Sequence, residues 1–434
     1  MKKFLIICVL TLFFYSIAGA TTMDFKTFKL GNGAKIKYLY RDSIPIVYVS
    51  VLIPASPLDE SKPSVAYLTA HLLTHGTKTM TAQQIEDKID FLAISIDKKI
   101  THDYTMLTLA TTKRHLKEAL NLFFDVLMNP TFPEEELKKE LARVEKSLKQ
   151  LEEDPSYIAY KTFIKQLFNK HPYGRPVEGE PEELRNITRH DILDFYKKFY
   201  NPQAMVFSVV GSIDERELKE LIEKPISLWQ GSLYNRIVNP PSFKERNEPL
   251  KIYVKRQDLT QSTVVLGFEG ISRQDPDFYA LSVMNYILGG GGLTSRLAKQ
   301  VREERGLAYS VYSTFSPYLM PGAFYVEVKT KKENTQDVIK LIIEEIKKMK
   351  EKEVTDEELK EAKSFLTGSF PLRIDTMKKI SEFLPVIDFY GLGDNYITKY
   401  PEYIEKVTKE DIKRVTQRIL NTQGYIVVIV GKDL

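Results

Sequence analysis

Residues 201–211 read Asn-Pro-Gln-Ala-Met-Val-Phe-Ser-Val-Val-Gly, and residues 421–431 read Asn-Thr-Gln-Gly-Tyr-Ile-Val-Val-Ile-Val-Gly. A Thr-x-x-Asp pattern, typical of a helix N-terminal cap, precedes each stretch, and each contains a β-branched run typical of a strand. The matching positions are a constant 220 residues apart: Thr188 and Thr408, Asn201 and Asn421, Gly211 and Gly431. A constant spacing over a helix, a turn and a strand indicates a duplicated domain.

The beginnings of the two halves also agree. Residues 34–53 and 250–268 are rich in Ile, Val and Tyr, which predicts a pair of strands in each half, and a helix is expected after each pair, at 64–73 and 276–288. Long helices such as 134–152 follow, and then more strands. This order predicts an α+β fold with two homologous domains, each a mostly antiparallel sheet with helices packed on one face.

Length and composition are those of a soluble globular protein with more than one domain. The chain has 434 residues, too many for one hydrophobic core, with 43% apolar and 28% charged residues. Its net charge is only +4, and Lys and Glu alternate along the helices, so no basic stripe points to nucleic acid. We predict a signal peptide at 1–20, an N-terminal domain at 21–235, a Pro- and charge-rich linker at 236–249 and a C-terminal domain at 250–434.

The N-terminus has the three parts of a secretory signal peptide. Lys2 and Lys3 precede an apolar run over residues 4–17, and Ala18-Gly19-Ala20 supplies small residues for cleavage. The run is short for a membrane span, although an uncleaved anchor is the alternative. The single cysteine, Cys8, falls inside this segment, so the mature chain would contain neither disulfides nor a catalytic thiol. We expect a secreted, periplasmic protein.

A candidate zinc motif occurs at residues 71–75, His-Leu-Leu-Thr-His. It differs by one residue from His-x-x-Glu-His, the inverted zinc-peptidase signature, in which the glutamate is the general base. Thr74 stands in the place of that glutamate, and its hydroxyl cannot act as a base near neutral pH. A surviving site would need His71, His75 and a nearby acid such as Glu145, because a catalytic zinc takes three protein ligands.

A longer motif places the zinc ligands elsewhere. The chain resembles the pitrilysin/insulinase family of zinc peptidases, in the two-domain form of mitochondrial processing peptidase and its bacterial relatives. Those proteins read Leu-Ala-His-Leu-Leu-Glu-His-Met-Leu-Phe-Lys-Gly-Thr, and residues 65–77 here read Val-Ala-Tyr-Leu-Thr-Ala-His-Leu-Leu-Thr-His-Gly-Thr. The two align without a gap when they are anchored on the final Gly-Thr. The later stretch His-Pro-Tyr-Gly-Arg-Pro-Val-Glu-Gly at 171–179 is another family hallmark.

In that register the resemblance implies a degenerate zinc site. Tyr67 replaces the first histidine ligand, Ala70 replaces the glutamate base, and only the second histidine is kept, as His71. The family's spacing to the third ligand leads to Ser147, while the companion acid two helical turns earlier is present as Glu140. One imidazole cannot hold zinc, so we expect no metal and no cofactor in this chain. His75 would then cap the end of a helix.

The second half keeps a different part of the family's site. In the family an arginine and a tyrosine seven positions apart complete the active site from the opposite domain, and they match Arg302 and Tyr309. An arginine can orient a peptide carbonyl, and a tyrosine hydroxyl can donate to an oxyanion. The family's processing peptidase also has a glycine-rich loop here that handles substrate, which implies a peptide-binding role for Gly289, Gly290, Gly291 and Gly292.

These features predict the non-catalytic subunit of a secreted heterodimeric zinc endopeptidase. It would supply a chamber wall, a peptide-binding surface, Arg302 and Tyr309 to a homologous subunit that holds the zinc, and it would not cleave peptides alone. The partners expected are that subunit and a peptide or unfolded protein, with no nucleic acid and no membrane after signal cleavage. The alternatives are a pseudo-peptidase that acts as a structural or peptide-binding protein, and a self-sufficient zinc metallopeptidase.

Overall fold

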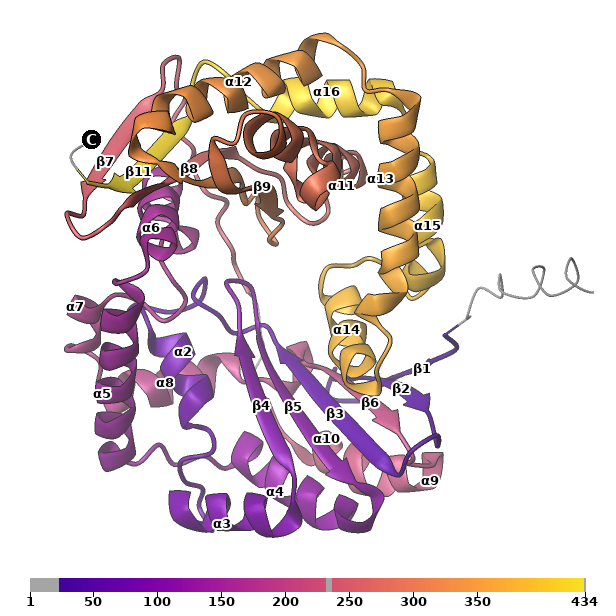
Figure 1. Ribbon diagram of the computed structural model, residues 1–434. Helices are drawn as coiled ribbons and strands as arrows, with labels where there is room; N and C mark the ends of the chain where they lie inside the picture. The colour runs from indigo at the N-terminus through magenta and orange to yellow at the C-terminus, as the bar shows by residue number, and fades with distance from the viewer. Residues whose placement is uncertain (1–22, 232–235, 433–434) are drawn as a thin grey trace, which may run out of the picture.

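Two β-sheets, one in each half of the chain, organise the molecule (Figure 1). The structure is a computed structural model that describes residues 23–231 and 236–432; the predicted signal peptide lies outside them. The strands of the first sheet are β1 (Lys26–Lys29), β2 (Lys35–Tyr40), β3 (Ile46–Ile53), β4 (Ser95–Ile100), β5 (Thr105–Thr112) and β6 (Val206–Gly211). Those of the second are β7 (Leu250–Lys255), β8 (Gln261–Glu269), β9 (Ala308–Ser316), β10 (Ala323–Lys331) and β11 (Ile426–Gly431).

The strand orders are β1-β2-β6-β3-β5-β4 and β7-β11-β8-β10-β9. The pairs β2–β6 and β7–β11 are parallel, and the other neighbours are antiparallel. The prediction of two homologous, mostly antiparallel α+β domains is therefore confirmed. The exact boundaries at residues 235 and 250 remain a prediction.

Helices fill the segments between the strands. They are α2 (Val65–Leu72), α3 (Ala82–Leu92), α4 (Leu116–Met128), α5 (Glu134–Leu151), α6 (Pro155–Phe168), α7 (Pro181–Leu184), α8 (Arg189–Phe199), α9 (Glu215–Leu218), α10 (Lys224–Leu228), α11 (Phe278–Asn285), α12 (Thr335–Glu351), α13 (Asp356–Ser369), α14 (Met377–Phe389), α15 (Tyr396–Glu405) and α16 (Lys409–Ile419). Within the described ranges, none of these helices has the length and apolar character needed to cross a bilayer.

The internal repeat is visible in the elements themselves. Helix α8 and strand β6 recur 220 positions later as α16 and β11, with the same lengths. Thr188 and Thr408 both form complete capping boxes, in which each threonine accepts from the N–H of the aspartate three residues on. The cap therefore fixes the start of each helix as the sequence predicts.

Each half lends one helix to the sheet of the other half. Helix α6 lies between β5 and β6 of the first half along the chain, yet it packs on β8 and β11 of the second sheet. Helix α14 of the second half packs on β3 and β6 of the first sheet (Figure 1). These two helices are counterparts in the 220-residue repeat. The face of the first sheet that carries Val47, Val49 and Val51 packs against that half's own helices, so the exchanged helices cover the remaining faces.

Helix α14 lies along a row of polar residues that crosses the first sheet. The residues of this polar row pair directly with one another from β1 to β4: Thr27, Lys37, Ser208, Ser50, Thr108 and Asp97. Polar side chains of α14 contact this row at several points along the helix. Lys378 forms an ion pair with Asp97, and the Ser381 hydroxyl lies 2.9 Å from that of Ser50.

The far end of the polar row is held by a buried lysine. The Lys37 side chain is fully buried, and its Nζ lies 2.6 Å from Asp394 and 3.4 Å from Asp388, just beyond and within α14 respectively. Lys35 pairs with Asp388 as well, at 2.7 Å. Burying an ammonium is unfavourable unless it is paired, so Lys37 requires the second half of the chain for its stability.

The other exchanged helix makes an apolar contact. Phe163 of α6 is fully buried, and its ring lies against Gly267 of β8, where a Cβ would come within 2.2 Å of the ring. Ala159 and Ile164 of the same helix pack with Val265 and Val428 of the second sheet. The missing side chain at position 267 thus creates the space for the aromatic ring.

A buried aspartate ties the hairpin turns of the two halves together. Asp103, between β4 and β5, accepts hydrogen bonds from the hydroxyls of Tyr173 and Tyr390 at 2.5 and 2.7 Å and from the backbone N–H of Leu319 at 2.8 Å. Burial, with the charge of Asp103, raises the pKa of both tyrosines, so they remain donors. Since Tyr390 and Leu319 belong to the second half, the contact fixes one half against the other.

Candidate functional site

Helix α2 carries the residues that match the family's zinc motif. Ala70 is buried, whereas Tyr67 and His71 are half-buried on neighbouring turns. The two rings stack, with centroids 4.2 Å apart and planes inclined by 28°. Tyr67, at the position of the first ligand, therefore contacts the one histidine that the chain keeps. The N-terminal end of α2 is held by Glu60, which accepts from the N–H of Ala66 at 2.9 Å.

An arginine from α5 joins this cluster. Arg143 donates from Nε to Oε2 of Glu140 at 2.8 Å and from Nη2 to Oε1 at 2.5 Å, a bidentate contact between residues one helical turn apart. The same Nη2 lies 3.1 Å from Nδ1 of His71. Glu140 and His71 thus share a guanidinium, and the Glu140 side chain is only 3% exposed. We call Tyr67, His71, Glu140 and Arg143 the guanidinium cluster.

The hydrogen bonds define the protonation of His71. A guanidinium only donates, so Nδ1 accepts and the ring proton of neutral His71 is on Nε2. Burial lowers the pKa of His71 to about 4, which keeps the ring neutral. Burial alone would raise the pKa of Glu140, but the hydrogen bonds from Arg143 together with the neighbouring charges hold that pKa below its usual value. The bond to Glu140 raises the pKa of Arg143.

Strand β4, an edge strand of the first sheet, adds a second cation. Lys98 donates to the backbone carbonyl of His71 at 2.9 Å and to Oγ1 of Thr74 at 2.6 Å. Burial lowers the pKa of Lys98 to about 8. His75 bonds to the same His71 carbonyl through Nδ1 at 3.0 Å, and its backbone N–H donates to Leu72. His75 thus caps the end of the helix, as predicted, but through a hydrogen bond: burial lowers its pKa and disfavours the cation that the prediction assumed.

The residues present do not fit a zinc ion. Nδ1 of His71 is taken by Arg143, Nε2 carries the proton, and both oxygens of Glu140 are paired with the guanidinium. Ser147 is exposed, and Glu145 pairs with Lys149 at 2.9 Å. In the part of the chain that the structure describes, no three His, Cys, Asp or Glu side chains form a group that could hold a metal. A guanidinium, not a set of ligand atoms, occupies the centre of the motif.

The predicted arginine–tyrosine pair lies on the second half. Arg302 is exposed in a π-helical segment, residues 298–303, and Tyr309 is 55% exposed on edge strand β9. The turn between them is closed by the N–H of Gly306, which donates to the Arg302 carbonyl at 3.0 Å. Tyr309 sits where the β9–β10 register shifts, and such a bulge turns a side chain away from the regular alternation. Both side chains can reach an outside molecule, while their catalytic role remains a prediction.

The glycine run is ordered and tightly packed. Gly289 and Gly290 end a π-helical turn that continues α11, and Gly292 has a φ of 62°, which favours glycine. A Cβ at Gly289 would lie 2.6 Å from the backbone nitrogen of Ser313 in β9, and one at Gly291 would lie 2.8 Å from a carbonyl oxygen. Close packing therefore accounts for part of the run, and its binding of peptide stays a prediction.

Arg143 and Lys98 are the functional candidates that sequence reasoning missed. Arg143 follows Glu140 by one helical turn, which is a local signal for an ion pair. Its bond to His71 joins residues 72 positions apart and has no local signal. Lys98 lies on β4 and contacts the end of α2, and nothing in the sequence around it indicates that contact.

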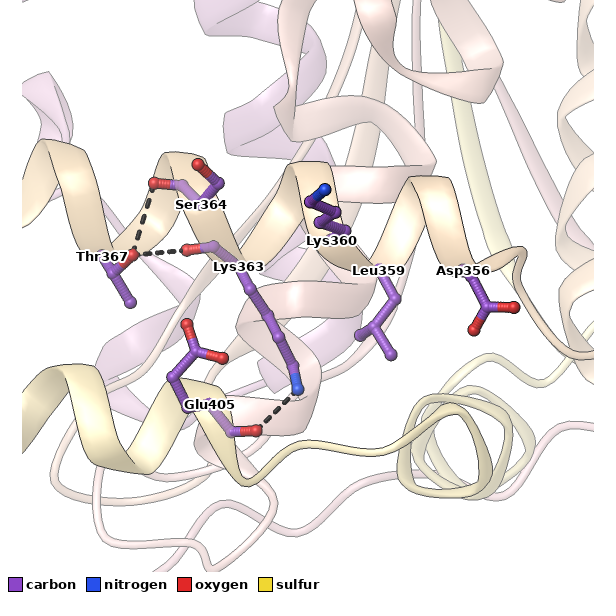
Figure 2. A pocket seen from close by; sticks show the side chains of 7 residues that line it. All are labelled: Asp356, Leu359, Lys360, Lys363, Ser364, Thr367 and Glu405. Atoms are coloured by element: carbon purple, nitrogen blue, oxygen red, sulfur yellow. Dashed lines mark hydrogen bonds between the residues drawn. The ribbon is translucent and has the colours of Figure 1, made fainter.

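A surface pocket elsewhere carries no comparable chemistry. It lies between α13 and α15, has a volume of about 390 Å³, and includes Lys363, Thr367 and Glu405 in its lining (Figure 2). Lys363 donates to the carbonyl of Glu405 at the end of α15, at 2.6 Å, and the Thr367 hydroxyl donates back to the Lys363 carbonyl within α13, at 2.8 Å, so both side chains serve the helix backbones.

Sequence comparison gives a consistent result along the chain. The family profile described as Insulinase (Peptidase family M16) matches residues 38–180, and the profile described as Peptidase M16 inactive domain matches residues 186–366. A protein of Rickettsia bellii, named an uncharacterized zinc protease, is 26% identical over 95% of this chain and 98% of its own length. A Bacillus subtilis protein with the same description is 26% identical over 94% of this chain and 98% of its own.

Solved structures agree with the fold. The crystal structure of a peptidase M16 inactive domain from Pseudomonas fluorescens superposes with a TM-score of 0.86 at 26% identity, covering 95% of this chain and 99% of that one. A protease from Helicobacter pylori superposes with a TM-score of 0.85 at 20% identity, covering 94% and 99%, and this similarity concerns the fold alone.

Proposed function

Since the chain belongs to the M16 (insulinase) family of peptidases, we propose that it is a non-catalytic subunit which completes the site of a zinc-bearing relative. It would be exported to the periplasm, hold an extended peptide and supply Arg302 and Tyr309 from its second half. It would carry no zinc itself. The comparisons already identify the chain as an M16 protein of the inactive type.

One observation carries the proposal: a guanidinium takes the place of the metal while the arginine–tyrosine pair remains exposed. Arg143 engages His71 and Glu140, two of the groups that would otherwise face a metal ion. Arg302 and Tyr309 are accessible on the other half. A subunit with this combination lacks the nucleophile-generating part of a zinc peptidase site and retains the part that binds the peptide carbonyl.

Edge strands provide the peptide-binding surface. Strand β4 ends the first sheet next to α2, and β9 ends the second sheet and carries Tyr309. An extended peptide can add to such an edge through main-chain hydrogen bonds, which gives binding with little sequence preference. This supports a role in holding unfolded segments of varied sequence.

The test is metal content and peptide cleavage of the mature chain, alone and then mixed with a zinc-motif relative from the same source. The proposal expects no zinc and no cleavage alone, and cleavage or faster cleavage on mixing. Arg302→Ala and Tyr309→Phe should each lower the rate of the mixture about 10²–10³-fold, the effect of losing one oxyanion donor. Lys299→Ala, an exposed charge in the same segment, serves as the matched control. Full activity with both variants would refute the shared site.

A pseudo-peptidase without a catalytic partner is the second candidate. The guanidinium cluster favours it as much as it favours the first, because both need only the loss of zinc. It predicts peptide binding by the chain with no gain in cleavage when any relative is added. A self-sufficient zinc peptidase is not supported, since Arg143 engages Nδ1 of His71 and Glu145 pairs with Lys149.

A further inference from the structure

The guanidinium cluster has the features of an anion-binding position beside β4. Arg143 is held rigidly by Glu140 and His71, yet 58% of its side chain is exposed. Its Nε and Nη2 atoms supply the N–H groups used in those bonds, and Nη1 carries two more. The guanidinium also donates a hydrogen bond to the Tyr67 hydroxyl, which takes up one of the remaining N–H groups. Burial raises the pKa of Tyr67, so the hydroxyl keeps its own proton and can donate it to a ligand.

The charges of the cluster leave an excess of positive charge. His71 is neutral, and the charge of Glu140 is balanced by that of Arg143. The ammonium of Lys98 is a second cation, close enough to interact electrostatically with both Glu140 and Arg143. The nearby Glu178 acts on Tyr67, but burial raises its pKa and so reduces its tendency to ionise. A fixed guanidinium with an additional cation is the arrangement that binds carboxylates.

The position of the cluster relates it to a peptide on the sheet edge. Lys98 belongs to β4 and bonds to the carbonyl of His71, so the strand and the cluster are joined directly. Ser147 lies one turn beyond Arg143 on the same face of α5 and is exposed. A chain added along β4 would pass the Arg143 guanidinium at the position of the degenerate zinc motif.

On the basis of the peptide binding proposed above, we infer that Arg143 binds a carboxylate of a peptide lying along β4, either its C-terminal carboxylate or an acidic side chain. The position then selects peptides by charge and anchors them without cleavage. Arg143 is suited to this because Glu140 and His71 fix its plane before the ligand arrives, and a pre-ordered fork loses little freedom on binding.

The test is fluorescence polarisation with three labelled peptides of alternating threonine and valine. The first ends in a free carboxylate, the second in an amide, and the third in an amide with one internal glutamate. The wild-type chain is expected to bind a carboxylate-bearing peptide about tenfold more tightly than the neutral amide, the low end for a hydrogen bond to a charged group. The first and third peptides distinguish the two sources of the carboxylate.

Variants assign the preference to Arg143. Arg143→Gln should remove the preference, and Arg143→Lys should keep only part of it because the fork is lost. The double variant Arg143→Gln, Glu140→Gln avoids an unpaired buried carboxylate and should behave like Arg143→Gln. Lys149→Gln removes a charge elsewhere on α5 and should leave the preference unchanged.

The outcomes separate this inference from the proposed function. Equal binding of charged and neutral peptides, or a preference that survives in the double variant, would overturn the carboxylate site and leave peptide binding standing. If none of the three peptides binds the wild-type chain, peptide binding itself is refuted, and the carboxylate site with it.

Discussion

Phe163→Ala is expected to destabilise both halves of the molecule together. Phe163 belongs to the first half by sequence, but its ring is fully buried on the second sheet against Gly267. Truncating a buried phenylalanine costs about 3–5 kcal/mol. We expect about 4 kcal/mol, since the backbone of β8 forms one wall of the hole and cannot collapse into it. Domains of ordinary stability have only about 5–15 kcal/mol in total.

Urea unfolding with two probes distinguishes joint from separate unfolding. Trp229, the single tryptophan, packs on the core of the first half, whereas far-UV circular dichroism follows both halves. Because each half lends a helix to the other, Phe163→Ala should move both transitions to lower urea by the same amount. Phe91→Ala, which truncates a side chain that is 84% exposed, should change stability by less than about 0.5 kcal/mol. An unmoved Trp229 transition beside a two-step circular dichroism curve would refute the reasoning.

Acid should weaken the fold through His71, whose pKa burial lowers from 6.5 to about 4. The unfolded chain binds this proton at a higher pH than the folded chain does, so the contribution of His71 to stability is fully present above pH 6.5. The free energy of unfolding then falls by up to about 3 kcal/mol as the pH drops towards 4. In His71→Gln the urea midpoint should depend less on pH over this range. Tyr67→His with Ser147→Glu should leave the chain without zinc while Arg143 is present, and adding Arg143→Ala should allow about one zinc per chain, measured by atomic emission after dialysis. Zinc uptake with Arg143 in place would contradict the blocking role. Asp103→Asn should lower the free energy of unfolding by about 1.5–3 kcal/mol, and with it the melting temperature, because an amide nitrogen then faces a group that already donates. An unchanged melting temperature would argue against Asp103 as a contact that fixes one half against the other.

The repeat in the sequence predicts the repeat in the structure because its signals are local. Capping boxes at Thr188 and Thr408 and β-branched runs after them act within a few residues, so α8, α16, β6 and β11 form where the pattern indicates. The π-helical turn at Tyr286–Gly290 is different. A run of glycines is typical of a flexible loop, but Gly289 packs against Ser313 of β9, a contact between residues far apart in the sequence that no local pattern predicts.

The exchange of α6 and α14 could not be predicted from the same patterns. An apolar helix face shows that a helix is buried, but it does not name the sheet that buries it. The substituted positions of the zinc motif could be identified individually by aligning the sequence with the motif of the family that it resembles. Arg143, which fills their place, could not be identified in this way, because two helices and two strands separate it from its partner His71 in the chain.

The polar row under α14 has a consequence for the growing chain. Ribosomes complete the first sheet when β6 ends at Gly211, long before α14 begins at Met377. Until α14 is made, the face of the sheet that it will cover is exposed to water. The serines, threonines, Lys37 and Asp97 on this face can be hydrated during that interval. An apolar face left uncovered for the same interval would invite aggregation. The polar face therefore keeps the first sheet soluble after its last strand, β6, is made, and α14 later completes that face with ion pairs and hydroxyl contacts.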